Sequence, residues 1–203
     1  MLSERVRNIA GSTTLEIDAK AKQLKKDGKD IVNFSAGEPD FNTPENIKQA
    51  AIKAINNNLT RYTPAGGIPE LKKAIAEKFK RENNIDYNIS EILVSCGGKH
   101  SLYNILMAIL NKGDEVILSV PYWVSYEEMI KLAEAKPVFC NTDKMFKLTA
   151  DMINNKITDK TKMLILNSPS NPSGAIIDPS EIRKIAALAI EHKLYVVSDE
   201  VYE

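Results

Sequence analysis

The chain has 203 residues, of which 43% are hydrophobic and 27% charged, which suits a globular protein with a sizeable core. Lys plus Arg and Asp plus Glu number 27 each, so no net charge favours nucleic acid or an anionic membrane. No apolar run approaches the roughly 20 residues of a membrane helix, and the charged start does not resemble a secretory signal. We therefore expect a cytoplasmic protein with no nucleic-acid partner and no membrane partner.

The two cysteines, Cys96 and Cys140, lie on apolar runs and lack the C-x-x-C spacing of redox and zinc motifs. We expect both to be buried free thiols, as is usual in cytosolic proteins. With only two histidines in the chain, these cysteines cannot build an ordinary zinc site, and no metal ligand is expected.

The first 90 residues are expected to be mainly helical. Hydrophobic spacing and end signals predict a short extended run over 31–34 and helices over 14–26, 44–57 and 69–83. Gly28 suits the end of the first helix. Thr43 suits the N-cap of the second helix, and Pro44 its first position.

From residue 91 the pattern changes to short apolar strands that alternate with amphipathic helices. Strands are predicted over 92–95, 115–119, 137–140, 163–166 and 194–198, and helices over 99–110, 124–133 and 178–192. This order is typical of an α/β fold with a mostly parallel sheet and flanking helices. Ligands bind beyond the carboxyl ends of the strands in such sheets, so functional residues are expected there.

The first strand is followed by Cys96-Gly97-Gly98-Lys99, with two glycines at a predicted helix start. Backbone N–H groups and the helix dipole suit a phosphate there, although a plain glycine-rich turn explains the pattern equally well. A nucleotide P-loop is excluded because Leu93 stands where its first glycine would be, and no G-x-G-x-x-G occurs.

Three later strand ends also carry unusual residues. Pro121-Tyr122-Trp123 follows the second strand, and its aromatic rings either cover a planar ligand or pack in the core. The segment 167–174 follows the fourth strand, where prolines before and after Asn171 predict a rigid loop that can contain a cis bond. Asp199 ends an otherwise apolar strand, so its carboxylate must have a partner.

Six motifs occur in a recognisable order and spacing: Gly37-Glu38-Pro39-Asp40, Tyr62-Thr63-Pro64 with Gly67-Ile68-Pro69-Glu70-Leu71, Gly97-Gly98-Lys99, Pro121-Tyr122-Trp123-Val124-Ser125, Asn171-Pro172-Ser173-Gly174 and Ser198-Asp199-Glu200-Val201-Tyr202. Together they resemble the class I pyridoxal-phosphate aminotransferases of fold type I, in the bacterial-type aspartate aminotransferase branch. The resemblance covers essentially the whole chain. Ser173 departs from the pattern, because the family more often has threonine there, but the hydroxyl is kept.

The resemblance implies a pyridoxal 5'-phosphate cofactor and gives several residues a role in binding it. Asp199 would pair with the pyridine nitrogen and keep the ring protonated. Trp123 would stack on the ring face, and Asn171 and Tyr202 would hydrogen-bond the phenolic oxygen of the ring. The phosphate would be bound by the backbone of Gly97, Gly98 and Lys99 and by Tyr62 from the neighbouring subunit, which implies a homodimer.

The resemblance also implies how a dicarboxylic amino acid and a 2-oxo acid are bound. The backbone of Gly37 would contact the α-carboxylate, Trp123 and Asn171 would lie beside the substrate, and Lys99 would reach the distal carboxylate. The alternative is an ordinary surface lysine. A cation is mildly unfavourable in the first turn of a helix, which favours the functional role of Lys99.

In the family, the lysine that forms the Schiff base lies beyond the position of Glu203, as does the arginine that binds the α-carboxylate. We therefore expect no catalytic residue within the 203 residues and no transaminase activity from them alone. The resemblance makes residues 1–45 an N-terminal arm and small-domain segment, and residues 46–203 the N-terminal part of the large cofactor-binding domain. It also implies that residues 92–95 lack their usual strand neighbours, while the other four strands form a parallel block.

The implied reaction is transamination of L-aspartate with 2-oxoglutarate, which gives oxaloacetate and L-glutamate. An aminotransferase for prephenate or aromatic amino acids is the alternative within the fold, because such enzymes share these motifs. A non-catalytic regulatory or binding domain of the same fold is the alternative from another class. A basic winged-helix extension would favour it, and residues 1–30 show none.

Overall fold

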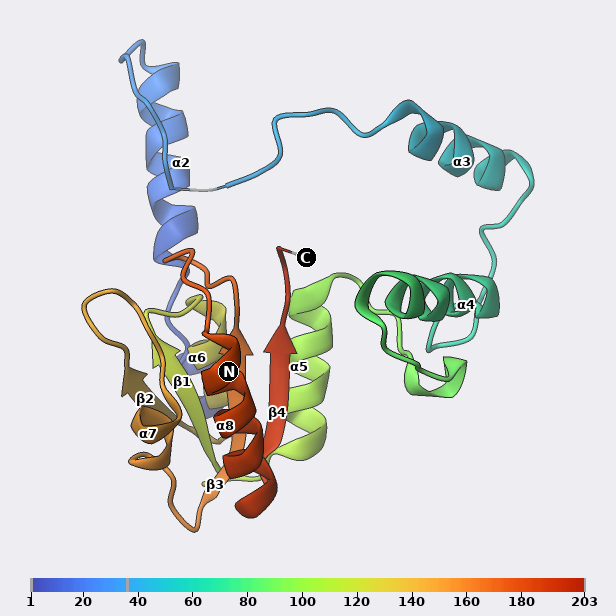
Figure 1. Ribbon diagram of the computed structural model, residues 1–203. Coiled ribbons are helices and arrows are strands. Elements are labelled where there is room, and N and C mark those ends of the chain that lie inside the picture. Colours follow the sequence, from blue (N-terminus) through green and yellow to red (C-terminus); the bar gives the residue numbers. More distant parts are fainter. Residues whose placement is uncertain (1, 36, 203) are drawn as a thin grey trace. The chain divides into compact units, whose positions relative to one another are not determined.

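The computed structural model describes residues 2–35 and 37–202 (Figure 1). The chain divides into two compact units, which we call the sheet unit (residues 2–12 and 97–202) and the helical unit (residues 13–96). The domain division at residue 45 follows from the family resemblance and stays a prediction. Within the described ranges, no helix combines the length and the apolar character that a membrane span requires.

The sheet unit is built on four parallel strands in the order β2-β1-β3-β4. They are β1 (Glu115–Val120), β2 (Lys136–Asn141), β3 (Thr161–Asn167) and β4 (Tyr195–Asp199). The bounds agree closely with the strands predicted from residue 115 onward. The predicted four-strand parallel block is therefore confirmed.

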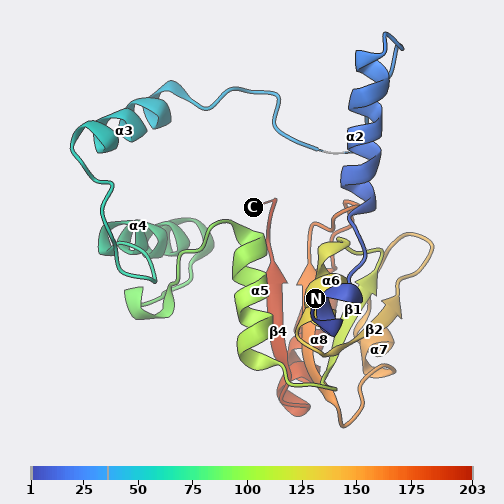
Figure 2. The same ribbon diagram turned by 180° about the vertical axis from the view of Figure 1, so that it is seen from behind.

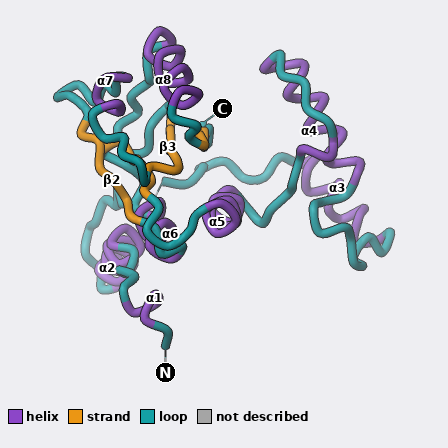
Figure 3. Tube along the Cα trace, turned by 90° about the horizontal axis from the view of Figure 1, so that it is seen from below, coloured by secondary structure: helices purple, strands orange, loops and turns teal. Residues whose placement is uncertain are grey.

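Helices cover both faces of this sheet (Figure 3). One face carries α5 (Gly98–Ile109) and α6 (Ser125–Leu132), and the other carries α7 (Ala150–Asn154) and α8 (Pro179–Glu191). The alternation of side chains along β1 explains this arrangement. Val116 and Leu118 pack in the core beneath α5 and α6, whereas Ile117 packs in the core beneath α7 and α8. The central strands are therefore apolar on both faces, as is usual in parallel sheets.

Local hydrogen bonds fix the start of α8 and the amino-terminal segment of the sheet unit. The Asp178 carboxylate accepts the Ser180 N–H at 2.7 Å and caps α8, and Pro179 is the first helical residue. The short helix α1 (Glu4–Arg7), which was not predicted, lies beside α6 (Figure 2). The Ala10 N–H then donates to the Glu128 carboxylate at 3.0 Å, which ties the amino-terminal segment to α6.

The helical unit contains α2 (Thr13–Lys26), α3 (Glu45–Asn56) and α4 (Pro69–Lys78), followed by a π-helical turn, η1 (Phe79–Asn83), and a 3-10 turn, η2 (Ile89–Glu91). The three predicted helices are confirmed. Thr43 is not the N-cap of α3, however, because Pro44 has an extended ψ of 144° and itself takes that position. Residues 31–34 form no strand.

The prediction of a strand over 92–95 is wrong. Within the described part of the chain these residues pair with no strand, and the Val94 N–H instead donates to the Gly66 carbonyl at 3.0 Å. Gly67 permits this approach, since its φ is +101° and a Cβ there would lie 2.6 Å from Val94 Cγ2. Among the described strands β4 pairs with β3 alone, so residues 92–95 are not hydrogen-bonded to β4 as a fifth strand.

Candidate active site

The carboxyl ends of the parallel strands meet at one edge of the sheet, where ligands bind in this class of fold. Asn167, the last residue of β3, lies in register with Asp199, the last residue of β4. Trp123 lies in the segment between β1 and α6, and Asn171 lies in the loop after β3. These predicted residues are thus brought to the same edge by the strand order.

Asp199 has the partner that its place in an apolar strand requires. The hydroxyl of Tyr126, in the first turn of α6, donates to Oδ2 of Asp199 at 2.5 Å. Burial, reinforced by the hydrogen bond to Asp199, raises the pKa of Tyr126 far above its ordinary value. The phenol therefore stays protonated at neutral pH and acts as the donor, while the carboxylate is the acceptor.

The side-chain amide of Asn167 joins the end of β4 to the loop after β3. Its Nδ2 donates to the carbonyl oxygen of Asp199 at 2.8 Å, and its Oδ1 accepts the N–H of Asn171 at 2.6 Å. The side chain is buried, so both of its polar atoms need such partners. One amide group thereby fixes the end of β4 and the start of the proline-containing loop relative to β3.

Trp123 joins Lys99 to the Asp199 pair. The indole meets the ring of Tyr126 edge to face, with 5.3 Å between ring centroids and 88° between planes. The Lys99 ammonium lies 4.9 Å from a ring centroid of Trp123, within the range of a cation–π contact. Lys99, Trp123, Tyr126 and Asp199 thus form a continuous row of contacts along the carboxyl edge.

The start of α5 supplies a turn that suits an anion. Gly97 has a φ of +90°, a conformation that favours glycine, and its carbonyl accepts the N–H groups of His100 and Ser101. The first backbone N–H groups of a helix lack acceptors within the helix, and the helix dipole adds partial positive charge. Cys96, which precedes this turn, is exposed, so the prediction that it is buried is wrong. Its position after the unpaired segment 92–95 explains this exposure, whereas Cys140 on β2 is buried as predicted.

The loop after β3 is held by its own serine hydroxyls. Oγ of Ser168 accepts the Ile177 N–H at 3.1 Å, and Oγ of Ser173 accepts the Ala175 N–H at 3.3 Å. The Ser168-Pro169 and Asn171-Pro172 peptide bonds are both cis, so the cis bond that the sequence allowed is present. The two hydroxyl hydrogen bonds hold the loop on the carboxyl side of Asn171.

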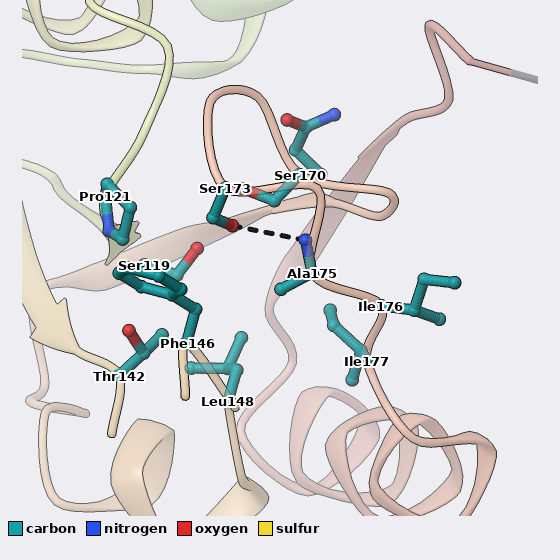
Figure 4. Close-up of a pocket in the computed structure, with 11 residues that line it drawn as sticks. Ser119, Pro121, Thr142, Phe146, Leu148, Ser170, Ser173, Ala175, Ile176 and Ile177 are labelled. Atoms are coloured by element: carbon teal, nitrogen blue, oxygen red, sulfur yellow. Dashed lines mark hydrogen bonds between the residues drawn. The ribbon is translucent and has the colours of Figure 1, made fainter. Parts of the chain in front are cut away.

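A cavity of about 20 Å³ lies beneath this loop, between Ser173 and the side chains of Ser119, Thr142 and Phe146 (Figure 4). A second cavity, of about 10 Å³, adjoins Tyr122 and Tyr126. Spaces of this size hold at most a water molecule. Neither cavity could therefore hold a ligand as large as an aromatic cofactor.

The remaining predicted residues are exposed. Tyr202 follows β4 and is 59% exposed. Gly37 and Tyr62 belong to the helical unit and are described only within it, and the Tyr62 side chain is fully exposed. No role was predicted for Tyr126 or for Asn167, which begins the loop segment 167–174. The Trp-x-x-Tyr spacing across the start of a helix was a usable signal for Tyr126.

The parallel sheet, the two helical layers and the ligand edge match the large domain of fold type I aminotransferases. A sequence model of the family described as aminotransferase class I and II matches residues 29–203. The chain belongs to this family, whose members use pyridoxal phosphate.

The similar proteins match this chain over its whole length. An aspartate aminotransferase of Bacillus sp. (strain YM-2) is 51% identical, and a probable aspartate/prephenate aminotransferase of Rickettsia bellii (strain RML369-C) is 53% identical. Each match covers 100% of this chain and 52% of the relative. The structure of an aspartate aminotransferase from Thermus thermophilus with maleate is 45% identical, with a TM-score of 0.97, and the match covers 100% of this chain and 54% of that one. The chain spans about half the length of the curated relatives it matches.

The residues at the edge fit the chemistry of pyridoxal phosphate. Asp199 presents a carboxylate to which no Lys, Arg or His forms an ion pair among the described residues, and so suits a cationic ring nitrogen. Trp123 supplies an aromatic face, and the Gly97-Gly98 turn suits a phosphate. All three features belong to the sheet unit.

Proposed function

We propose that these 203 residues are part of a pyridoxal-phosphate-dependent aminotransferase that converts L-aspartate and 2-oxoglutarate to oxaloacetate and L-glutamate. The observation that carries the proposal is the Asp199 carboxylate, fixed by Tyr126 beside Trp123 at the ligand edge of the sheet. Membership of the aminotransferase family and relatives described as aspartate aminotransferases support it. The proposed protein is a cytoplasmic homodimer that binds neither nucleic acid nor membranes.

In this proposal the cofactor ring, when bound, supplies an electron sink for the negative charge that develops on the substrate carbon. Asp199 keeps the ring nitrogen protonated, and Trp123 covers one face of the ring. The backbone of Gly97, Gly98 and Lys99 binds the phosphate, to which Tyr62 of the second subunit adds a hydrogen bond. Asn171 and Tyr202 donate to the phenolic oxygen.

The dicarboxylic substrate is the finer part of the proposal. The Lys99 ammonium lies over the Trp123 ring, 4.9 Å from a ring centroid. From the same side chain, a charge-assisted hydrogen bond would bind the distal carboxylate. The backbone of Gly37 binds the α-carboxylate, and Trp123 and Asn171 flank the substrate. The similar Thermus thermophilus structure is that of an aspartate aminotransferase with maleate, which is also a dicarboxylate.

The proposal gives the covalent chemistry to residues outside positions 1–203. In this proposal, the lysine that bonds to the cofactor and the arginine that binds the α-carboxylate would lie in the remainder of the full-length protein. The match to the Bacillus relative covers 52% of that relative's length. Residues 1–45 are proposed as the arm and small-domain segment of the whole enzyme, and residues 46–203 as part of its large domain.

A second substrate pair is supported by the relative described as a probable aspartate/prephenate aminotransferase. Prephenate also carries a carboxylate distant from its oxo acid group, so Lys99 could bind it in the same way. The two candidate substrates would require different amounts of space around this carboxylate from the rest of the enzyme.

The test is a comparison of kcat/KM for the purified full-length protein loaded with pyridoxal phosphate. L-Aspartate with 2-oxoglutarate is expected to be the preferred pair, with L-glutamate and prephenate as the second assay. A preference for prephenate would assign the second function, and a protein that transfers no amino group from any donor would refute the proposed class of activity.

A further inference from the structure

We infer that Tyr126 is a positioning residue of this site, which binds one carboxylate oxygen of Asp199 and leaves the other to pair with the cofactor ring. This inference rests on the proposed function. It assigns a role to a side chain that the family resemblance did not name as binding the cofactor or the substrate. Its basis is the contact between the Tyr126 hydroxyl and Oδ2 of Asp199, at 2.5 Å.

Tyr126 is itself held firmly. It is 2% exposed and belongs to the hydrophobic cluster that includes Leu106, Leu118 and Ile130. Its backbone N–H donates to the Trp123 carbonyl at 3.0 Å, and its ring packs against the indole. The phenol therefore approaches Asp199 from a fixed direction, and its hydroxyl, surrounded by apolar side chains, depends on that acceptor.

Asp199 is held at two separate points. Asn167 and the pairing of β4 with β3 fix its backbone, and Tyr126 fixes its side chain. A carboxylate that accepts one hydrogen bond at Oδ2 cannot rotate freely, so Oδ1 keeps one direction. Such preorganisation removes part of the entropy cost of pairing with a cationic ring nitrogen. A tyrosine is suited to this task because its neutral donor orients the charge without neutralising it.

The test is a double-mutant cycle on the full-length protein, with the dissociation constant for pyridoxal phosphate as the readout. Tyr126→Phe keeps the ring in the core and removes only the hydroxyl, and it is expected to weaken cofactor binding about tenfold. In an Asp199→Ala background the same substitution is expected to change the dissociation constant by less than about twofold, since its acceptor is gone.

Tyr195→Phe is the matched control. Tyr195 begins β4, at the end of the strand opposite Asp199, and its half-exposed ring lies beneath the Lys162 ammonium. This variant is expected to bind pyridoxal phosphate within about twofold of the unmodified protein. Thermal unfolding of each apoprotein identifies any variant whose loss of affinity comes from unfolding.

The outcomes separate this inference from the proposed function. Equal losses for Tyr126→Phe in both backgrounds would assign Tyr126 to core packing and overturn its positioning role, while the proposed function stands. No loss in either background would overturn it in the same way. If Asp199→Ala bound pyridoxal phosphate as tightly as the unmodified protein, both the proposed role of Asp199 and the inference would fall.

Discussion

The sheet unit and the helical unit have equally regular sequence patterns but differ in how far their side chains are buried. Among the described residues, every buried hydrophobic side chain of the core lies in the sheet unit, from Leu102 to Ala189. In the helical unit the apolar face of α3 stays open, with Ile47 and Ile55 53% and 63% exposed. Helix formation follows local spacing, whereas burial requires a second element. The helical unit therefore has the predicted helices without the core that their patterns anticipate.

The same contrast separates the proposed site residues. Asp199 is held through its carboxylate by Tyr126 and through its backbone by Asn167. Tyr62, in the helical unit, is fully exposed. Residues on the sheet edge are thus preorganised by their own unit, and a role for Tyr62 requires another surface, which the proposed homodimer would supply.

The largest effect is expected from removing the carboxylate at the sheet edge. Asp199→Ala in the full-length protein should lower kcat for transamination about a thousandfold, because a loss of about 4 kcal/mol in transition-state stabilisation follows when the ring nitrogen is no longer kept protonated. Steady-state kinetics with aspartate and 2-oxoglutarate measure it. Asp159→Asn, on an exposed turn of the same unit, is the control and should leave kcat unchanged. A loss smaller than about tenfold would mean that Asp199 is not the partner of the ring.

The second effect concerns the free energy of unfolding of the two units. Ile130→Ala removes a side chain that is 0% exposed in the sheet unit and should cost about 3 kcal/mol. Ile55→Ala changes a side chain that is 63% exposed in α3 and should cost less than about 1 kcal/mol. Denaturant unfolding of the full-length protein compares the two variants. Similar losses would contradict the comparison and show that the apolar face of α3 is covered in the full-length protein.

A smaller and more selective effect is expected at Lys99. Lys99→Ala should reduce kcat/KM for aspartate about tenfold to a hundredfold, as loss of a charge-assisted hydrogen bond predicts, and should leave alanine nearly unaffected. Lys112→Ala removes an exposed lysine beyond the other end of α5 and should change neither value. Equal losses of kcat/KM for aspartate and for alanine would show that Lys99 does not bind the distal carboxylate.

The sheet and its helices could be predicted because their signals are local. The apolar runs of β1 to β4 are short and bounded by turn residues, and α8 carries its own cap at Asp178. The five-residue helix α7 is too short to show a period, so it was missed. The segment 92–95 has the composition of a strand, but composition does not reveal whether a neighbouring strand is present.

The site was predicted in part for the same reason. Asp199 and Trp123 stand in motifs that can be read along the chain, and the need of Asp199 for a partner followed from its apolar surroundings. The identity of that partner did not, because Tyr126 lies 73 residues away and reaches Asp199 only through the packing of α6 on the sheet. Asn167 likewise acts across the β3–β4 register, 32 residues from Asp199.

The smallest effect is a pH dependence at the opposite, amino-terminal edge of the sheet. Glu115 accepts hydrogen bonds from Thr158 at 2.7 Å and Lys136 at 3.0 Å, and these, Thr158 first, lower the pKa of its carboxyl in the folded protein. A lowered folded pKa stabilises the fold fully above the ordinary value of 4.5, and this contribution is lost as the pH falls through the lower folded value. Lys136 is 70% exposed, so solvent screening keeps the contribution below about 1 kcal/mol. The Tm of Glu115→Gln should therefore fall less than the Tm of the unmodified protein between about pH 5 and about pH 3. Equal falls in Tm for the two proteins would show that Glu115 adds nothing to acid sensitivity.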